Sequence, residues 1–336
     1  MQQLAVDFDR AKWVRPEIGS GGDGHTFPGA TYPFGLVQPS PDTGREGYRY
    51  CSGYRYEDDR IFGFSQTHLS GTGCGDLGDL RIMPFAGKAS SSVSSAFRKE
   101  TQVCEPGYYA VTLDDPRVRA EAAAAPHCAI YRFTYPSAKA ALLVDCQWGI
   151  GGRDFAKTIL ECDARVEDGR LKGTTVRRHW VKRQYSYVVE FDHPVVSHEK
   201  LPAENSEEKG PRFALEFDLS DGRPLVVKIG YSLVGVDGAE KNLAAELPDF
   251  DFDRIRAAAL AEWDKTLSRM EVKGSDTEKI NFFSAMYRLF IQPNNIADVD
   301  GRYRGADGEV HVAQGAFIIP RFRFGTLSGR IIRLRR

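Results

Sequence analysis

Glycines alternate with polar side chains in one short segment, 64–79, which reads FSQTHLSGTGCGDLGD. Glycine lets the backbone approach a ligand closely, and His68, Ser70, Thr72 and Asp76 add hydrogen-bond donors and acceptors at the same place. This combination suits a sugar better than a lipid or a nucleobase. A tight connection of several turns without a ligand is the alternative, and the segment alone leaves it open.

A second glycine-dense segment, 19–35, reads GSGGDGHTFPGATYPFG and contains His25. Between the two segments lies YRYCSGYRY at 48–56, whose tyrosines occupy even positions, as they would on one face of a strand. Tyr50, or Tyr48 in its place, would then stack on the apolar face of a pyranose ring. An aromatic core stripe is the alternative, because aromatics with period two commonly face a core.

Short strands are the elements that position these segments. From about residue 13 to 235 the sequence alternates strand patterns with turn signals, for example at 108–113, 129–133, 141–145, 185–191 and 213–217. Regular strands without helical patterns between them predict a large antiparallel β-sandwich. After Pro248 the period changes to that of a helix, at 252–270 and again from Asp276 to about Pro293.

Composition excludes several classes of function. The formal net charge is −1 over 336 residues, and no basic stripe favours nucleic acid or an anionic membrane surface. No apolar run is long enough to span a bilayer. The first residues show no basic segment followed by an apolar core, so no secretory signal is visible, and localisation stays open.

Six cysteines occur without a C-x-x-C pair, which argues against a zinc ribbon or a redox dithiol. Most are expected to be buried as small hydrophobic residues. Cys51 and Cys74 lie within the glycine-rich motifs, and His68 is the only base close to either in sequence. A thiol nucleophile at one of them is therefore a further alternative.

Four motifs, at 18–31, 51–54, 63–76 and 106–109, together resemble glycoside hydrolase family 92. The resemblance covers roughly residues 13 to 317. It implies an amino-terminal β-sandwich packed on a carboxy-terminal (α/α)6 barrel, and a calcium-dependent exo-α-mannosidase that inverts the anomeric centre. It also implies a mannose-containing glycan as partner, and family members are often periplasmic or secreted.

The resemblance divides the chain into a β-sandwich at 13–235, a helical linker at 236–275 and the first helix of an incomplete (α/α)6 barrel at 276–317. The family's acid, base and most calcium ligands belong to the barrel beyond 317, so no catalytic residue or metal ligand is assigned. Spaced aspartates at 298–305 lack the spacing and closing glutamate of an EF-hand.

By the same resemblance the sandwich loops contact sugar in the −1 and +1 subsites. The residues expected there are His25, Tyr50, His68, Ser70, Thr72 and Asp76, with Tyr48 as the alternative aromatic. For the two histidines the alternative is a structural role, bonded to loop carbonyls.

The last segment, 318–336, departs from the family, because it is rich in arginine and has no acidic residue. Codons can be chosen for it that, read two nucleotides later, spell a tryptophan–aspartate–threonine segment resembling the family's continuation into the barrel. We therefore interpret 318–336 as a frameshift product. A basic tail for nucleic acid or membrane is the alternative.

Three hypotheses follow. The chain is the amino-terminal part of an α-mannosidase, inactive alone and with the missing catalytic half as a possible partner. It is a carbohydrate-binding sandwich without catalysis. Or it folds poorly, because Trp263, Phe283, Tyr287 and Phe290 lose their barrel partners and form an exposed apolar patch.

Overall fold

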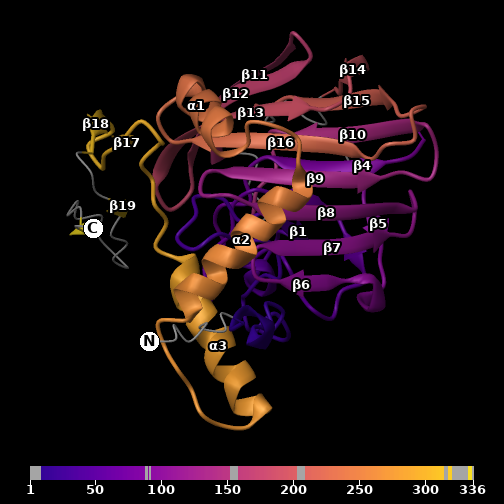
Figure 1. The fold of residues 1–336 in the computed structure, drawn as a ribbon. Helices are drawn as coiled ribbons and strands as arrows, with labels where there is room; N and C mark the ends of the chain where they lie inside the picture. Colours follow the sequence, from indigo (N-terminus) through magenta and orange to yellow (C-terminus); the bar gives the residue numbers. More distant parts are fainter. Residues whose placement is uncertain are drawn as a thin grey trace, which may run out of the picture.

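Two large antiparallel sheets face each other in this protein (Figure 1). The computed structural model describes residues 9–87, 90, 92–151, 158–202, 209–313, 317–319 and 332–334. Every strand pair in the part of the chain thus described is antiparallel. The predicted β-sandwich is therefore confirmed.

One sheet has six strands and the other has eight. The first has the order β1 (Ser40–Asp42), β3 (Gly63–Ser65), β4 (Arg81–Phe85), β10 (Lys139–Asp145), β15 (Arg212–Asp218) and β14 (Val195–Lys200). The second has the order β11 (Ile159–Glu167), β12 (Arg170–Arg178), β13 (Lys182–Phe191), β16 (Leu225–Ser232), β9 (Cys128–Thr134), β8 (Val118–Ala124), β7 (Tyr108–Leu113) and β6 (Val103–Glu105). Small pairs join β2 (Arg60–Ile61) to β5 (Ser95–Ala96) and β17 (Arg302–Arg304) to β18 (Val310–Val312).

The main core lies between the two sheets. Residues that alternate along the strands, such as Leu142 on β10 and Tyr131 and Phe133 on β9, belong to one buried cluster. A second cluster covers the opposite face of β9, where Cys128 and Ile130 contact helices. Central strands of the eight-stranded sheet are therefore buried on both faces, and this explains their nearly continuous apolar sequences.

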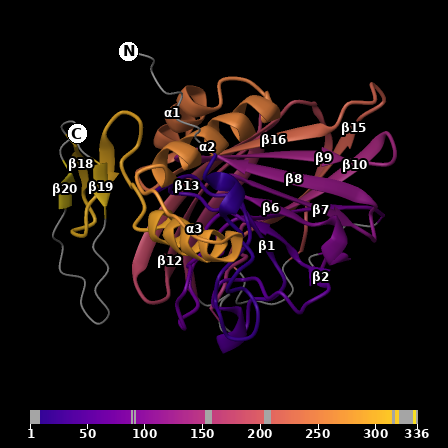
Figure 2. The same ribbon diagram turned by 60° about the horizontal axis from the view of Figure 1, so that its bottom comes forward.

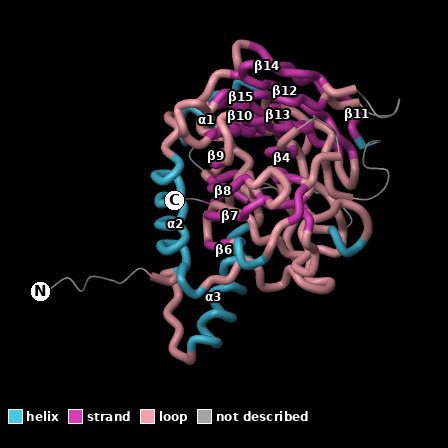
Figure 3. Tube along the Cα trace, turned by 90° about the vertical axis from the view of Figure 1, so that its right-hand side faces the viewer, coloured by secondary structure: helices cyan, strands magenta, loops and turns pink. Residues whose placement is uncertain are grey.

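Three helices follow the sandwich: α1 (Val236–Glu246), α2 (Phe252–Leu267) and α3 (Asp276–Ile291). Leu243 of α1 and Phe252 and Ile255 of α2 pack on the outer face of the eight-stranded sheet. Figure 3 shows α1 and α2 along one side of the sheets and many loops on the other. The helices predicted at 252–270 and from Asp276 are confirmed, and Asp251 caps α2 by accepting from the backbone N–H of Arg254. Helix α1 falls within the helical linker expected at 236–275, although no separate helix was predicted before Pro248.

Helix α3 packs against the amino-terminal segment of the sandwich (Figure 2). The Tyr287 hydroxyl lies 2.8 Å from Oγ1 of Thr31, and the indole N–H of Trp263 on α2 donates to the Thr31 carbonyl at 2.8 Å. Trp263, Phe283 and Tyr287 are buried and Phe290 is partly buried. The expectation that these four residues form an exposed apolar patch is therefore wrong. The segment 27–34 contacts Trp263, Tyr287 and Phe290.

The tyrosines at 48–56 do not form a strand, which corrects the expectation of a one-sided stripe. Tyr48–Tyr50 form a 3-10 turn, and Gly47 and Gly53 on either side have φ values of 84° and 76°. These left-handed conformations interrupt an extended backbone. Tyr54 is consequently buried, whereas Tyr48 and Tyr56 are exposed.

Within the arginine-rich segment 318–336 the structure describes only a short backbone pairing between β19 (Phe317–Ile319) and β20 (Ile332–Leu334). The rest of the proposed frameshift product lies outside the described residues. Among the residues that are described, no helix is both long enough and apolar enough to cross a membrane.

Candidate functional site

The glycine-rich segments of the sequence meet at one end of the sandwich. The backbone N–H of Gly71 donates to the His25 carbonyl at 2.7 Å, and that of Tyr56 donates to the Ser20 carbonyl at 2.9 Å. The backbone N–H of Ile150, which follows β10, donates to the carbonyl of Leu77 at 3.0 Å. We call the segments 19–35, 44–56 and 66–78 the loop cluster.

His68 is fully buried beneath this loop cluster and contacts only protein groups. Its Nδ1 lies 2.8 Å from the Gln38 carbonyl oxygen, and its Nε2 lies 2.9 Å from Oδ1 of Asp42. Nε2 also lies 3.1 Å from Oγ of Ser65, and Oδ2 of Asp42 accepts from the Trp148 indole at 2.7 Å. His68 therefore anchors the loops, as the structural alternative for this residue expected.

Gly53 allows this anchor to approach the neighbouring loop. Its φ is 76°, and a side-chain carbon there would overlap Oδ1 of Asp42 and the ring of His68. The nearby Cys51 thiol is buried, donates to the Tyr48 carbonyl at 2.9 Å, and has a pKa raised by burial. With the His68 ring already engaged, nothing here supports a thiol nucleophile.

Asp76 is also held by protein groups. Its Oδ1 lies 2.5 Å from Nη1 of Arg183, whose Nη2 donates to Asp79 at 2.9 Å. Burial acts to raise the pKa of Asp79, but the charges of Arg183 and Arg177 outweigh burial and hold that pKa below its ordinary value. Arginine side chains therefore hold both carboxylates, and these ion pairs brace the loop cluster against β12 and β13.

Tyr48 occupies the outer surface of the loop cluster together with His25. The Tyr48 side chain is 60% exposed, packs against Gly73, and meets the His25 ring edge to face at a centroid distance of 4.5 Å. His25 is buried, and its Nε2 has no hydrogen-bond partner among the described residues. Ser70 and Thr72, both partly exposed, belong to the same loop as Gly73.

The Tyr50 side chain has different neighbours from those of Tyr48. Its ring packs against Gly44, and its hydroxyl interacts with Asp58 and Arg55. Burial and then Asp58 raise the pKa of this phenol. Of the two tyrosines weighed in the sequence, Tyr48 is the one that lies beside His25 and the loop of Thr72.

The sequence interpretation missed a second exposed ring, that of Trp180. It lies in the turn between β12 and β13, is 67% exposed, and donates its indole N–H to the Gly75 carbonyl at 3.1 Å. Tyr48 at Gly73 and Trp180 at Gly75 therefore flank the same loop, at positions no more than about 7 Å apart along the chain. A lone tryptophan in a polar turn, RHWVK at 178–182, was the signal available in the sequence.

No described group of three or more histidine, cysteine, aspartate or glutamate side chains is arranged to hold a metal ion. In the loop that follows α3, Asp298 accepts hydrogen bonds from Ser232 and Asn242 at 2.7 and 2.8 Å. Asp300 is paired with Lys241 and Arg302. The described residues therefore do not by themselves fit a calcium site.

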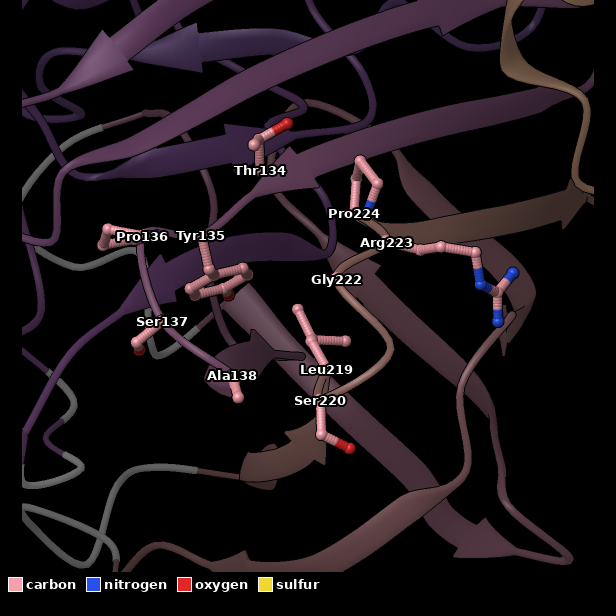
Figure 4. A pocket seen from close by; sticks show the side chains of 10 residues that line it. All are labelled: Thr134, Tyr135, Pro136, Ser137, Ala138, Leu219, Ser220, Gly222, Arg223 and Pro224. Carbon is pink, nitrogen blue, oxygen red and sulfur yellow. The ribbon is translucent and has the colours of Figure 1, made fainter.

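One cavity lies away from the loop cluster. It has a volume of about 310 Å³ and is lined by the turns 134–138 and 219–224 (Figure 4). These turns lie where β10 begins, whereas the loop cluster lies where β10 ends, roughly 20 Å away along a seven-residue strand. Arg223 on its rim is paired with Asp221 at 2.7 Å, and the cavity offers no group of convergent polar side chains.

The glycosyl hydrolase family 92 N-terminal domain matches residues 13–232, and the family's catalytic domain matches residues 238–322. The chain belongs to glycosyl hydrolase family 92.

Solved structures of the same family are similar to this chain. A family 92 α-mannosidase from Bacteroides thetaiotaomicron has a TM-score of 0.84 and 28% identity over 93% of this chain and 45% of its own. The same mannosidase has also been solved in complex with mannoimidazole. The family 92 glycosyl hydrolase ccman5 has a TM-score of 0.83 and 25% identity, over 94% and 45% of the two chains.

A fungal relative from Arthroderma benhamiae, described as an uncharacterized secreted glycosidase, is 27% identical over 85% of this chain and 42% of its own. The chain therefore spans less than half the length of the relatives it matches.

Proposed function

We propose that this chain is the amino-terminal part of a calcium-dependent, inverting exo-α-mannosidase that acts on α-mannosides of glycans or glycoproteins. Membership of family 92 supports this proposal, and so does the likeness to an α-mannosidase at 28% identity and a TM-score of 0.84. The complex of that mannosidase with mannoimidazole supports a mannose-type ligand for the family fold.

In this proposal the chain supplies one wall of the sugar site. The observation that carries it is the exposure of Tyr48 and Trp180, at 60% and 67%, on either side of one glycine-rich loop. Exposed rings present apolar faces on which a pyranose stacks, and a few polar groups fix its orientation. His25, Ser70 and Thr72 are the polar groups that we assign to this role, whereas His68 and Asp76 position the loops.

Inversion requires a carboxylic acid and a carboxylate held about 6.5–9.5 Å apart on either side of the scissile bond. Within the loop cluster and directly beneath it, Asp42, Asp76 and Asp79 are buried and paired with a cationic or N–H donor, whereas Asp23 and Glu46 are exposed. By the family resemblance we assign neither acid nor base here and propose that both, with the calcium ligands, belong to the catalytic part of the family. The chain by itself is proposed to be inactive.

The face of α3 that points away from the sandwich supports a missing neighbour. Phe282 and Leu289 lie seven residues apart on this helix, and both are exposed. In our proposal this face packs against further barrel helices.

A carbohydrate-binding module without catalysis is the second candidate, and the two exposed rings favour it equally. Activity separates the two candidates. We expect no hydrolysis of an aryl α-mannoside by the chain alone, hydrolysis after addition of a family 92 catalytic barrel, and loss of that activity in excess chelator. If a barrel that restores activity to another family 92 sandwich gave no hydrolysis with this chain, only the sugar-binding candidate would remain.

A further inference from the structure

The segment 19–26, which contains His25, forms a loop whose two ends meet. The backbone N–H of Thr26 donates to the Gly19 carbonyl at 3.3 Å, and the Thr26 hydroxyl donates to the Ile18 carbonyl at 3.1 Å. We call this segment the His25 loop. Its own hydrogen bonds close the loop at its base, so any group that holds the base also holds the residues within it.

One side chain of helix α3 bonds to both ends of the His25 loop. Arg288 donates from Nη1 to the Phe27 carbonyl at 3.0 Å and from Nη2 to the Ile18 carbonyl at 3.2 Å. Nη2 also donates to the Pro16 carbonyl. Ile18 and Phe27 are the residues directly before and directly after the loop. A single guanidinium therefore spans the base of the His25 loop.

The chemistry of the arginine side chain suits this role. Its planar guanidinium directs several N–H donors in fixed directions, so it can bond to two carbonyls at once. The guanidinium carbon of Arg288 also lies 6.0 Å from the centre of the Phe27 ring and 5.5 Å from that of the Tyr287 ring. Among the described residues no carboxylate forms an ion pair with Arg288, and its hydrogen-bond acceptors are the three backbone carbonyls.

His25 has a backbone conformation that needs such support. Its φ is 53°, in the left-handed region that few residues with a side chain adopt unless the surrounding structure enforces it. Its carbonyl accepts from the Gly71 N–H of the neighbouring loop at 2.7 Å, and its ring meets the exposed Tyr48 ring. The buried Nε2 has no hydrogen-bond partner among the described residues.

We propose that Arg288 is a positioning residue for His25. By holding both ends of the His25 loop, it enforces the left-handed backbone of His25 and sets the imidazole ring beside Tyr48. The part that His25 plays toward a mannoside rests on the proposed function, whereas the support of the loop by Arg288 does not. A helix that follows the sandwich thus shapes a loop of the sandwich that we assign to sugar binding.

Hydrogen exchange of the full chain, read by mass spectrometry of peptides that cover 19–26, tests the support of the loop. Arg288→Met removes the donors and keeps most of the apolar stem. Exchange in this segment should become roughly tenfold faster or more, because a hydrogen bond to a charged group contributes at least that factor. The control is Met286→Ala, which removes a buried side chain of the same helix and should leave this segment close to wild type.

The NMR signal of the His25 ring tests the positioning of the side chain itself. This signal is identified by its absence from the spectrum of His25→Gln. In Arg288→Met it should shift, because the ring moves relative to the face of Tyr48. In Arg288→Lys, which retains a cationic donor without the planar fork, both the shift and the faster exchange should be smaller than in Arg288→Met. Met286→Ala should leave the signal in place.

Wild-type exchange at 19–26 together with an unshifted His25 signal in Arg288→Met would overturn the proposal, and so would equal changes in Met286→Ala. If Arg288→Met fails to fold, Arg288→Lys decides: faster exchange confined to 19–26 supports the proposal, and wild-type exchange there overturns it.

Binding of methyl α-mannoside is measured separately, and Arg288→Met should weaken it as much as His25→Gln does. A wild-type chain that does not bind this sugar contradicts the proposed function, while the exchange and the His25 signal still decide the role of Arg288.

Discussion

His68 and Asp42 form a buried pair beneath the exposed surface of the loops. The ring nitrogens of His68 contact Gln38, Asp42 and Ser65, Asp42 also accepts from the Trp148 indole, and neither side chain of the pair is exposed to solvent. Gln38 and Asp42 lie far from His68 in the sequence, so residue types and spacing alone could not separate an anchor from a ligand contact. The exposure of Tyr48 and Trp180 is likewise a product of tertiary structure.

Replacement of His68 by alanine should therefore be costly. It leaves the Asp42 carboxylate buried with one partner fewer, for which the expected loss is about 3–5 kcal/mol in the free energy of unfolding. Urea unfolding measures this loss. His311→Ala, which removes an exposed histidine paired with Asp307, should change the same quantity by less than about 0.5 kcal/mol. Equal effects of the two substitutions would contradict the anchoring role.

The two exposed rings should contribute to affinity and not to stability. Tyr48→Ala and Trp180→Ala are each expected to raise the dissociation constant for methyl α-mannoside about two- to twelvefold, because a stacking contact of about 0.5–1.5 kcal/mol is lost. Titration calorimetry at high sugar concentration measures the change. Tyr56→Ala, which removes an exposed tyrosine of the same segment, is the control and should leave the constant unchanged.

At the scale of elements, a histidine directly before β9 contributes to the attachment of α1 to the sandwich. The backbone N–H of His127 and its Nδ1 both contact the Glu246 carboxylate, at 2.8 and 2.5 Å. Burial lowers the pKa of His127, but the hydrogen bond and charge of Glu246, with a further contribution from Asp298, outweigh burial and raise it above 6.5. The protonated form is thus favoured in the folded state.

This attachment should depend on pH. Because the folded pKa is raised, the stabilisation from protonated His127 is fully present below pH 6.5 and is lost as pH rises through the folded value. The stability difference between wild type and His127→Gln should therefore be larger at pH 5.5 than at pH 9 in urea unfolding. A difference that is the same at both values, or larger at pH 9, would exclude this role.

Helix α2 contributes a large buried ring to the contact with the loop cluster. Trp263 is fully buried and its indole N–H is bonded to the Thr31 carbonyl. Trp263→Ala should lower the free energy of unfolding by about 3–5 kcal/mol. Phe282→Ala, at an exposed position on α3, should cost less than about 1 kcal/mol, and the reverse order would contradict the packing described here.

Strands and the longer helices could be predicted because their signal is local. The apolar runs of β7, β9, β10 and β13 and the helical period of α2 and α3 all correspond to observed elements. Helix α1 was expected only as part of the helical linker at 236–275, and its own period was not recognised because few of its residues are large and apolar: Gly238, Ala239, Asn242 and Leu243 are its buried positions. The strand expected at 48–56 was wrong because two left-handed glycines outweighed the period of the tyrosines.

For the whole molecule, residues of α2 and α3 belong to the main core of the sandwich. Trp263, Phe283 and Tyr287 belong to the same buried cluster as strands of both sheets. The expectation of a poorly folded product rested on these residues being uncovered, and their burial removes that argument. Phe282 and Leu289, exposed on α3, are the side chains left for the catalytic part that we propose.

The most direct test of the sugar-binding wall is saturation-transfer NMR of the chain with methyl α-mannoside, compared with methyl α-galactoside. We expect weak binding of the mannoside, seen as saturation transfer that is stronger than that to the galactoside. This transfer should be lost when Tyr48 and Trp180 are both replaced by alanine. Absence of transfer to the mannoside, or transfer that survives the double replacement, would contradict the assignment of this loop cluster to sugar binding.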